Sequence, residues 1–160
     1  MIDVEALRSC NLFEGLSQEE LQEIATIGEE ETYEAGELIC VEQELADRLF
    51  IIGAGRVEVR VHLHSSLEPD GEVSLEQVEP GSVFGWSSLV KQHRFTASVR
   101  ALERSHVIAI KGADLNALFE RNPHIGFVVM KQLAEVIALR LRRTREFCRE
   151  SGGECQENQS

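Results

Sequence analysis

The sequence predicts a mainly β domain, either a sandwich or a barrel, with helices flanking the strands. Between Glu30 and Ile110, short apolar or alternating runs are separated by turn residues at the spacing typical of all-β folds. Both ends of the chain instead place apolar residues at helical spacing. The predicted strands are Glu31–Tyr33, Leu38–Val41, Leu49–Ile52, Val57–Val61, Val73–Val78, Ala97–Leu102 and His106–Ile110.

Helical signals precede the strands. We expect Met1–Asn11 to form a short helix, and Ser17–Glu20 has the serine and glutamate spacing of a capping box. Apolar residues at helical spacing then follow, at Leu21, Ile24, Ala25 and Ile27. The sequence therefore predicts a small N-terminal helical lead.

Two further helices are expected after the strands. Gly112–Arg121 forms a short helix, and Asn122 caps a long final helix that begins at Pro123. The final helix carries two apolar stripes: Ile125, Val128 or Val129, Gln132, Val136 and Leu139 on one side, and Met130, Leu133 or Ala134, Ile137 and Leu141 on another. Because one stripe covers the β domain and the other would face water in a monomer, we expect a homodimer through this helix.

Composition limits the class of protein. The chain has 160 residues, 42% of them apolar, and a formal net charge of −12. We expect one domain at 1–150, with the barrel at about 30–110, the final helix at about 123–150 and a disordered polar tail at 151–160. The charge argues against nucleic-acid binding through overall electrostatics. Residues 1–12 lack the apolar segment of a signal peptide and no run approaches a membrane span, so we expect a cytoplasmic protein without membrane contact.

The cysteines are isolated along the chain. Cys10, Cys40, Cys148 and Cys155 form no C-x-x-C pair, which argues against a zinc or iron–sulfur site. We interpret them as reduced thiols, and we expect no bound metal.

One segment combines glycines, serines and an arginine. Gly85 is followed by Ser87 and Ser88 where a short helical turn begins, and backbone N–H groups at such a turn can hold an anion. Arg94 offers a planar set of donors suited to phosphate, and the small residues of Thr96–Val99 would let a ligand lie close to the strand. The pattern is typical both of an anion-binding loop and of a surface loop with a solvated arginine, and composition alone does not choose between them.

The same segment resembles a known family. The matching residues are Gly81-x-x-Phe84-Gly85, then Leu89, then Arg94-x-x-Ala97-x-Val99-x-Ala101. This pattern is similar to the phosphate-binding cassette of the cyclic nucleotide-binding domain, which is found in the catabolite activator protein and in protein kinase A regulatory subunits. The resemblance extends from about Leu12 to Thr144 and includes Leu49–Ile52 with its Gly53-x-Gly55-x-Val57 turn. It implies an eight-stranded jelly-roll barrel with N-terminal helices and a long C-terminal helix.

The cassette departs from the family pattern at two positions. Trp86 stands where the family usually has a glutamate for the ribose hydroxyl, and Phe95 stands where it has the arginine for the phosphate, with Arg94 one residue early. The family also places a polar residue of the last helix on the nucleotide base, which the resemblance assigns to Thr144. The expected ligand-binding residues are Phe84, Gly85, Trp86, Ser87, Ser88, Arg94, Phe95, Thr96, Ala97 and Thr144.

The resemblance implies a sensor or regulatory module. We expect it to bind a cyclic nucleotide such as cyclic AMP weakly, or another small anionic effector, and to signal through its C-terminal helix to an unidentified output protein. The sequence shows one basic cluster, at Arg140, Arg142, Arg143, Arg145 and Arg149. Catabolite-activator relatives read DNA with a helix-turn-helix domain after this helix, whereas here only 151–160 follows, so we expect a stand-alone module without direct DNA binding.

Two alternatives belong to other classes. One is a metal-binding cupin enzyme, because its first motif has a spacing similar to that of His62, His64 and Glu68. The second cupin motif needs a further histidine, and none follows Pro80. The other alternative is a structural partner that has lost its ligand. No nucleophile and base form a catalytic constellation, so we expect no catalytic residues and no enzyme activity.

Overall fold

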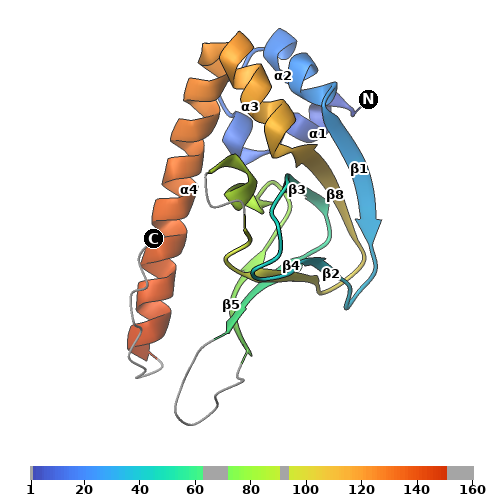
Figure 1. Cartoon of the computed structure of the whole chain (residues 1–160). Helices are drawn as coiled ribbons and strands as arrows, with labels where there is room; N and C mark the ends of the chain where they lie inside the picture. Colours follow the sequence, from blue (N-terminus) through green and yellow to red (C-terminus); the bar gives the residue numbers. More distant parts are fainter. Residues whose placement is uncertain (1, 63–71, 91–93, 151–160) are drawn as a thin grey trace.

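Two antiparallel sheets form the body of the molecule (Figure 1). The computed structural model describes residues 2–62, 72–90 and 94–150. In spatial order, the first sheet contains β1 (Gly28–Tyr33), β8 (Ser105–Lys111), β3 (Arg48–Ala54) and β6 (Val83–Phe84), and the second contains β2 (Leu38–Cys40), β7 (Ser98–Ala101), β4 (Val57–His62) and β5 (Glu72–Val78). The predicted mainly β fold is confirmed, with the difference that these two sheets do not close into a continuous barrel within the described residues.

The central strands β3 and β8 of the first sheet are buried on both faces, which explains their continuous apolar runs. Along β3, Leu49 and Ile51 point into a core shared with the helices, while Phe50 and Ile52 point into a second core between the two sheets. Strand β8 alternates in the same way, because successive side chains of a strand point to opposite faces. A central strand that is buried on both faces needs apolar side chains on both sides.

The N-terminal lead contains α1 (Val4–Arg8), the 3₁₀ helix η1 (Asn11–Phe13) and α2 (Gln18–Ala25), so the first helix is shorter than expected. The predicted capping box is confirmed: the Ser17 hydroxyl accepts from the Glu20 N–H at 3.2 Å, and the Glu20 carboxylate accepts from the Ser17 N–H at 3.1 Å. This reciprocal pair satisfies two N–H groups that the helix itself leaves without partners.

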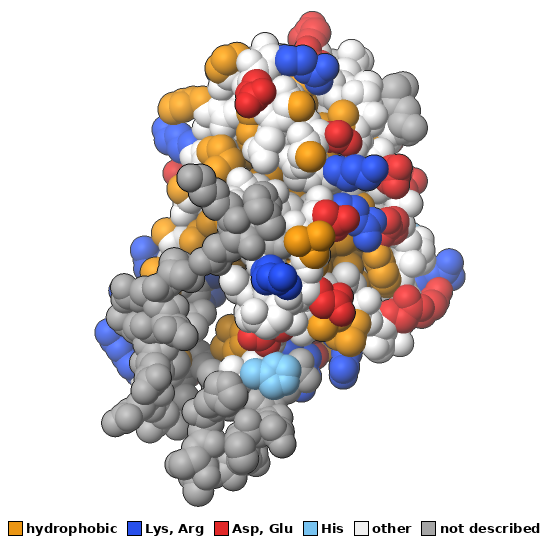
Figure 2. Space-filling model, viewed as in Figure 1, with side chains coloured by type: hydrophobic (Ala, Val, Ile, Leu, Met, Phe, Trp, Pro, Cys, Tyr) orange, Lys and Arg blue, Asp and Glu red, His pale blue; other side chains and the backbone are white. Residues whose placement is uncertain are grey.

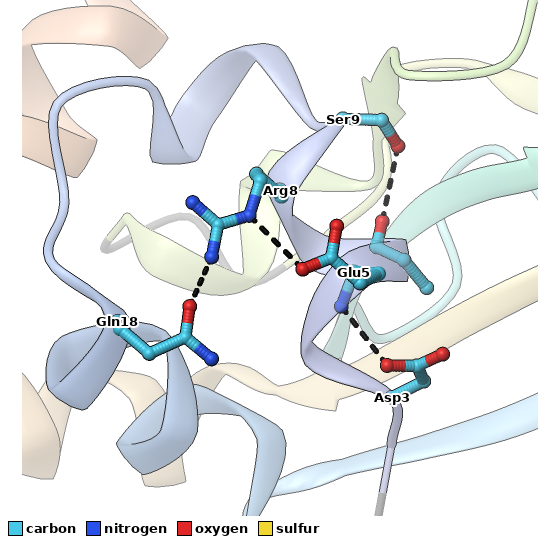
Figure 3. A network of polar contacts seen from close by, with 6 residues as sticks. Asp3, Glu5, Arg8, Ser9 and Gln18 are labelled. Atoms are coloured by element: carbon cyan, nitrogen blue, oxygen red, sulfur yellow. Dashed lines mark hydrogen bonds and ion pairs between the residues drawn. The ribbon is translucent and has the colours of Figure 1, made fainter.

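Polar contacts hold α1 against α2 (Figure 3). The Asp3 carboxylate caps α1 by accepting from the Glu5 N–H at 3.0 Å. Arg8, in the last turn of α1, donates both to Glu5 and to the side-chain oxygen of Gln18 at the start of α2. The two short helices therefore form one unit before they meet the sheet.

Helices α3 (Gly112–Arg121) and α4 (Pro123–Glu150) follow the sheets, with the predicted bounds. Figure 1 shows α4 running along the whole length of the molecule. Its first half buries Ile125, Val129 and Leu133 in the core shared with the N-terminal helices. Of the two alternatives at positions 133 and 134, Ala134 is exposed and Leu133 lies in the core, and Leu139, expected on the same side as Ile125, is exposed.

A row of apolar side chains on α4 faces outward. Large exposed hydrophobic side chains occur at Phe127, Met130, Ile137 and Leu141, and the exposed Ala134 lies between them. Figure 2 shows hydrophobic side chains at the surface on the α4 side of the molecule. The outward row, defined as positions 127, 130, 134, 137 and 141, alternates spacings of three and four residues, which is the spacing of a coiled-coil seam.

Two remaining expectations concern the cysteine thiols and a membrane span. Cys10 and Cys40 are free and buried, whereas Cys148 is disulfide-bonded, so the interpretation of all four cysteines as reduced is wrong for Cys148. None of the helices in the described ranges has both the length and the apolar character needed to span a bilayer.

Candidate functional site

The site begins at a sharp turn after β6. Gly85 has a φ of 79°, in the left-handed region that side chains disfavour, and it directly precedes the 3₁₀ helix η2 (Trp86–Leu89). A Cβ at this position would lie 2.9 Å from the Arg48 carbonyl oxygen and 3.1 Å from the Phe50 ring. Gly85 therefore lets the turn approach β3 closely.

A small cavity of about 50 Å³ lies beside this turn. Most of its lining comes from the cassette, with single residues added by β2, β4 and α4. The lining residues are Cys40, Val59, Phe84, Gly85, Trp86, Ser87, Phe95, Thr96, Ala97, Val99 and Arg140. Pockets that bind small molecules usually enclose about 300 to 1,000 Å³. The cavity as it stands is too small for a nucleotide.

Seven of the ten predicted binding residues line this cavity. They are Phe84, Gly85, Trp86, Ser87, Phe95, Thr96 and Ala97. The other three, Ser88, Arg94 and Thr144, are not among the lining residues. The glycine turn and the small-residue run, which are adjacent in the cassette, thus meet on one cavity from two sides.

Arg94 points elsewhere. Its guanidinium donates to the Gln43 carbonyl at 2.7 Å, its side chain is exposed, and its backbone forms an isolated antiparallel bridge with Leu45. The next residue faces the opposite way, since successive side chains of an extended chain alternate. Phe95, only 8% exposed, therefore points into the cavity and lines it.

Ser88 and Thr144 make local contacts. The buried Ser88 hydroxyl donates to the Gly85 carbonyl at 3.1 Å, and the Ser88 carbonyl packs against Gly112 so closely that a Cβ there would approach it to 2.3 Å. The Thr144 hydroxyl donates to the Arg140 carbonyl at 2.9 Å, one turn back along α4. Ser88 thereby fixes η2 to the start of α3, and Thr144 in this arrangement faces its own helix backbone.

Arg140 of α4 closes the mouth of the cavity. Its guanidinium carbon lies 4.4 Å from the centroid of the Trp86 ring, and Nη2 donates to the Val83 carbonyl at 2.5 Å. Sequence reasoning placed Arg140 in a solvated basic cluster and missed this role. The missed signal was periodicity: position 140 continues the buried face of positions 125, 129, 133 and 136.

Glu76 of β5 holds Arg140 from the other side. The Nε–Oε2 distance is 3.4 Å, and the second oxygen of the same carboxylate lies 2.9 Å from Arg143 Nη1. The Arg140 side chain is 13% exposed, and burial lowers its pKa, while the nearby Glu76 charge raises it and Arg143 lowers it. Two cations share one carboxylate, so this group of three side chains carries one net positive charge at the cavity mouth.

The residues proposed for a metal site are only partly described. His62 Nδ1 lies 2.9 Å from a Glu42 carboxylate oxygen, and the same oxygen accepts from the His62 N–H at 3.3 Å. His64 and Glu68 lie outside the described residues. Within the part of the chain that the structure describes, no group of three or more potential ligands could hold a metal ion.

Comparison with known proteins identifies the family. The model for the cyclic nucleotide-binding domain matches residues 30–122, which contain the cavity-lining residues of both sheets and η2. The chain belongs to the cyclic nucleotide-binding domain family. The match ends before α4, so the part of the site that Arg140 contributes lies beyond the family model.

Individual relatives agree with this assignment. The cyclic AMP receptor protein of Thermus thermophilus is 30% identical over 137 residues, which is 85% of this chain and 59% of that protein. A solved structure from Geobacter metallireducens, provisionally assigned as cyclic nucleotide-binding, shares 35% identity with a TM-score of 0.73 over 88% of this chain and 99% of that one. A cyclic nucleotide-binding domain from Methylobacillus flagellatus gives a TM-score of 0.79 at 20% identity, over 92% and 81% of the two chains, and supports the fold alone.

Proposed function

We propose that this cyclic nucleotide-binding domain is a regulatory module that binds a small anionic effector, of which a cyclic nucleotide is the first candidate, and signals through α4. The observation that carries the proposal is the shared cavity. Residues of the cassette and Arg140 of α4 line the same space, so a ligand seated there touches both the sheets and the helix. A ligand that binds more tightly when α4 is in one position shifts the population of molecules toward that position.

The cavity suggests how a ligand would be held. Its lining is largely apolar, with Phe84, Phe95 and Trp86 available to contact a flat base. Trp86 and Ser87, the first residues of η2, line the same cavity, and their N–H groups would suit an anionic oxygen because the first turn of a helix leaves its N–H groups without partners inside the helix. Neither cassette position that departs from the family supplies a charge, so we expect weak binding of cyclic AMP.

Ligand entry requires α4 to move, since the cavity is too small while Arg140 lies over Trp86. The outward row of α4 offers a way to transmit this movement. Pairing of that row with the same row of a second copy would bury Met130, Ile137 and Leu141 and form a homodimer. We propose this dimer as the form in which the module works, with its output partner contacting the paired helices.

Trp86 is the single tryptophan of the chain, so its fluorescence tests the proposal directly. Titration with cyclic AMP and cyclic GMP should give a saturable change, with half-saturation above the low micromolar range. Tight saturation at low micromolar concentration would refute weak binding and show that Arg140 and the backbone suffice. No change with either nucleotide, confirmed by calorimetry, would refute cyclic nucleotide binding.

A second candidate function is favoured by the size of the cavity. A site of about 50 Å³ filled by Phe95 and covered by Arg140 is also what a structural partner without a ligand would have. In that case α4 would hold one position and present a constant surface. Failure of all anionic probes to change Trp86 fluorescence or the melting temperature would support this candidate over the sensor.

A further inference from the structure

We propose that Arg140 is the residue that pairs with the negative charge of the ligand, in place of the arginine that the cassette lacks. This inference rests on the proposed function of the same cavity and assigns its anion-binding group to α4. The consequence is that binding of the ligand's charged group and movement of α4 are one event.

Charge and position single out Arg140. Among the described residues that line the cavity, it is the one with a formal charge. Arg94, the candidate nearest in sequence, is exposed and donates to the Gln43 carbonyl. An arginine guanidinium is planar and can donate two parallel hydrogen bonds to a phosphate, and here it lies over the Trp86 ring beside the cavity.

The ion pair between Arg140 and Glu76 is the contact that a ligand anion would replace. Its contact with Glu76 is 3.4 Å long, whereas the other oxygen of that carboxylate lies 2.9 Å from Arg143. If Arg140 turns to a ligand, Glu76 keeps Arg143 and no buried carboxylate is left unpaired. Burial disfavours the charged form of Arg140, as its lowered pKa shows, so a ligand anion that compensates this charge is favoured.

The two members of the ion pair should therefore act in opposite directions. Arg140→Gln removes the charge that attracts the anion and should weaken its binding about tenfold or more. Glu76→Gln removes the carboxylate that competes for Arg140 and should strengthen binding several-fold. In the double variant, Glu76→Gln should give no gain, because the arginine that it would release is missing.

The experiment measures Trp86 fluorescence and calorimetric binding of cyclic AMP, cyclic GMP and inorganic phosphate. It uses the full chain, these variants, Arg140→Lys, Arg94→Gln as the test of the other candidate arginine, and the control Arg142→Gln. Arg142 is exposed on the same helix and is not a lining residue, so its variant makes the same charge change away from the cavity. Arg140→Lys keeps the charge without the planar donors and should weaken binding less than Arg140→Gln. Thermal melts establish that each variant folds.

The outcomes separate this inference from the proposed function. Nucleotide binding that weakens with Arg140→Gln, strengthens with Glu76→Gln and ignores Arg142→Gln supports both. Nucleotide binding that is insensitive to Arg140→Gln, or that is lost with Arg94→Gln instead, overturns the inference and leaves the proposed function intact. Arg140-dependent binding of phosphate without nucleotide binding supports the inference and refutes the cyclic nucleotide. Absence of binding by all three probes overturns both.

Discussion

The central guanidinium carbon of Arg140 lies 4.4 Å from the centroid of the Trp86 ring, so the last helix contacts the cassette directly. A cation over an indole contributes about 0.5 to 2 kcal/mol, depending on exposure. Helix α4 also reaches β6 through the bond from Arg140 to the Val83 carbonyl. One side chain thus attaches the C-terminal half of α4 to two elements of the cassette.

This contact predicts a change in the unliganded protein. Arg140→Ala should expose the half-buried Trp86 ring to water, shift its emission to longer wavelength and increase quenching by acrylamide. Arg142→Ala, on the exposed side of the same turn, should leave both signals unchanged. Identical spectra for the two variants would show that Arg140 does not cover the indole in solution.

The turn at Gly85 predicts a difference between two glycine substitutions. Gly85→Ala meets both a positive φ of 79° and a carbonyl oxygen 2.9 Å from the new Cβ, whereas Gly36→Ala, at φ 91°, meets no atom within 4 Å. The strain of a left-handed alanine, about 1 to 2 kcal/mol, is common to both. Urea unfolding should therefore show that Gly85→Ala lowers the free energy of unfolding by at least about 1 kcal/mol more than Gly36→Ala. Equal losses would mean that the turn can move away from β3.

The contact between α2 and α4 predicts a dependence on pH. His124 Nδ1 lies 2.7 Å from a Glu20 carboxylate oxygen, and this hydrogen bond is the main cause that lowers the pKa of Glu20 below its ordinary value. A carboxylate whose folded-state pKa is depressed stabilises the fold above its unfolded-state pKa, and loses that effect as pH falls through the folded-state value.

Glu20→Gln should therefore lower stability at neutral pH, and its difference from the unmodified protein should shrink as the pH falls below the ordinary glutamate range. Glutamine at this position can still complete the capping box, so the variant removes mainly the charge. Glu19→Gln, exposed in the same first turn of α2, is the control for the helix dipole. Melting temperatures across pH 3 to 7 measure the effect, and a difference that stays constant over this range would contradict it.

The outward row of α4 predicts the oligomeric state. Ile137→Glu places a charge in the proposed seam and should give a monomer at micromolar concentration, by light scattering or sedimentation. Leu139→Glu makes the same type of change at a side chain that is 42% exposed but lies outside the row, and it should leave the dimer intact. A monomeric unmodified protein, or equal effects of both variants, would refute pairing through this row.

The sequence predicted the fold well because its signals are local. Strand alternation, the capping box and the glycine turns each depend on neighbouring residues, and each is confirmed. Strand β6 was missed since two residues, Val83 and Phe84, are too short to show a period. The sequence did not determine which side of α4 faces the core, because its two apolar stripes are close together around the helix. Leu133 could be placed only once the structure showed that it is buried.

The site was predicted only where the cassette is contiguous. Eight lining residues come from the cassette segment, and seven of them are among the predicted binding residues, the eighth being Val99. Arg140 comes from another part of the chain, and its relation to Trp86 depends on how α4 lies against η2, which no local pattern specifies. From the sequence, Arg94 looked able to replace the arginine that the cassette lacks. In the structure its side chain points away from the cavity, because successive side chains of an extended chain alternate.

The two departures of the cassette predict a gain of function. Phe95 is 8% exposed and lines the cavity, so Phe95→Arg would place a guanidinium where the family pairs the phosphate, and Trp86→Glu would supply the carboxylate for the ribose. The double variant should bind cyclic AMP at least about tenfold more tightly than the unmodified protein, because hydrogen bonds to charged groups contribute about 1.5 to 3 kcal/mol each.

The same double variant should be less stable without ligand, by about 2 kcal/mol or more, since it removes two large rings and places a charge at a buried position. Cyclic AMP should restore much of this loss, because a ligand that binds the folded state raises its stability with concentration. Trp86→Gln with Phe95→Leu removes the rings without adding charge and serves as the control. Calorimetry with thermal melts in the presence and absence of cyclic AMP measures both effects. A double variant that binds no better than this control would show that the cavity does not present these two positions to a nucleotide.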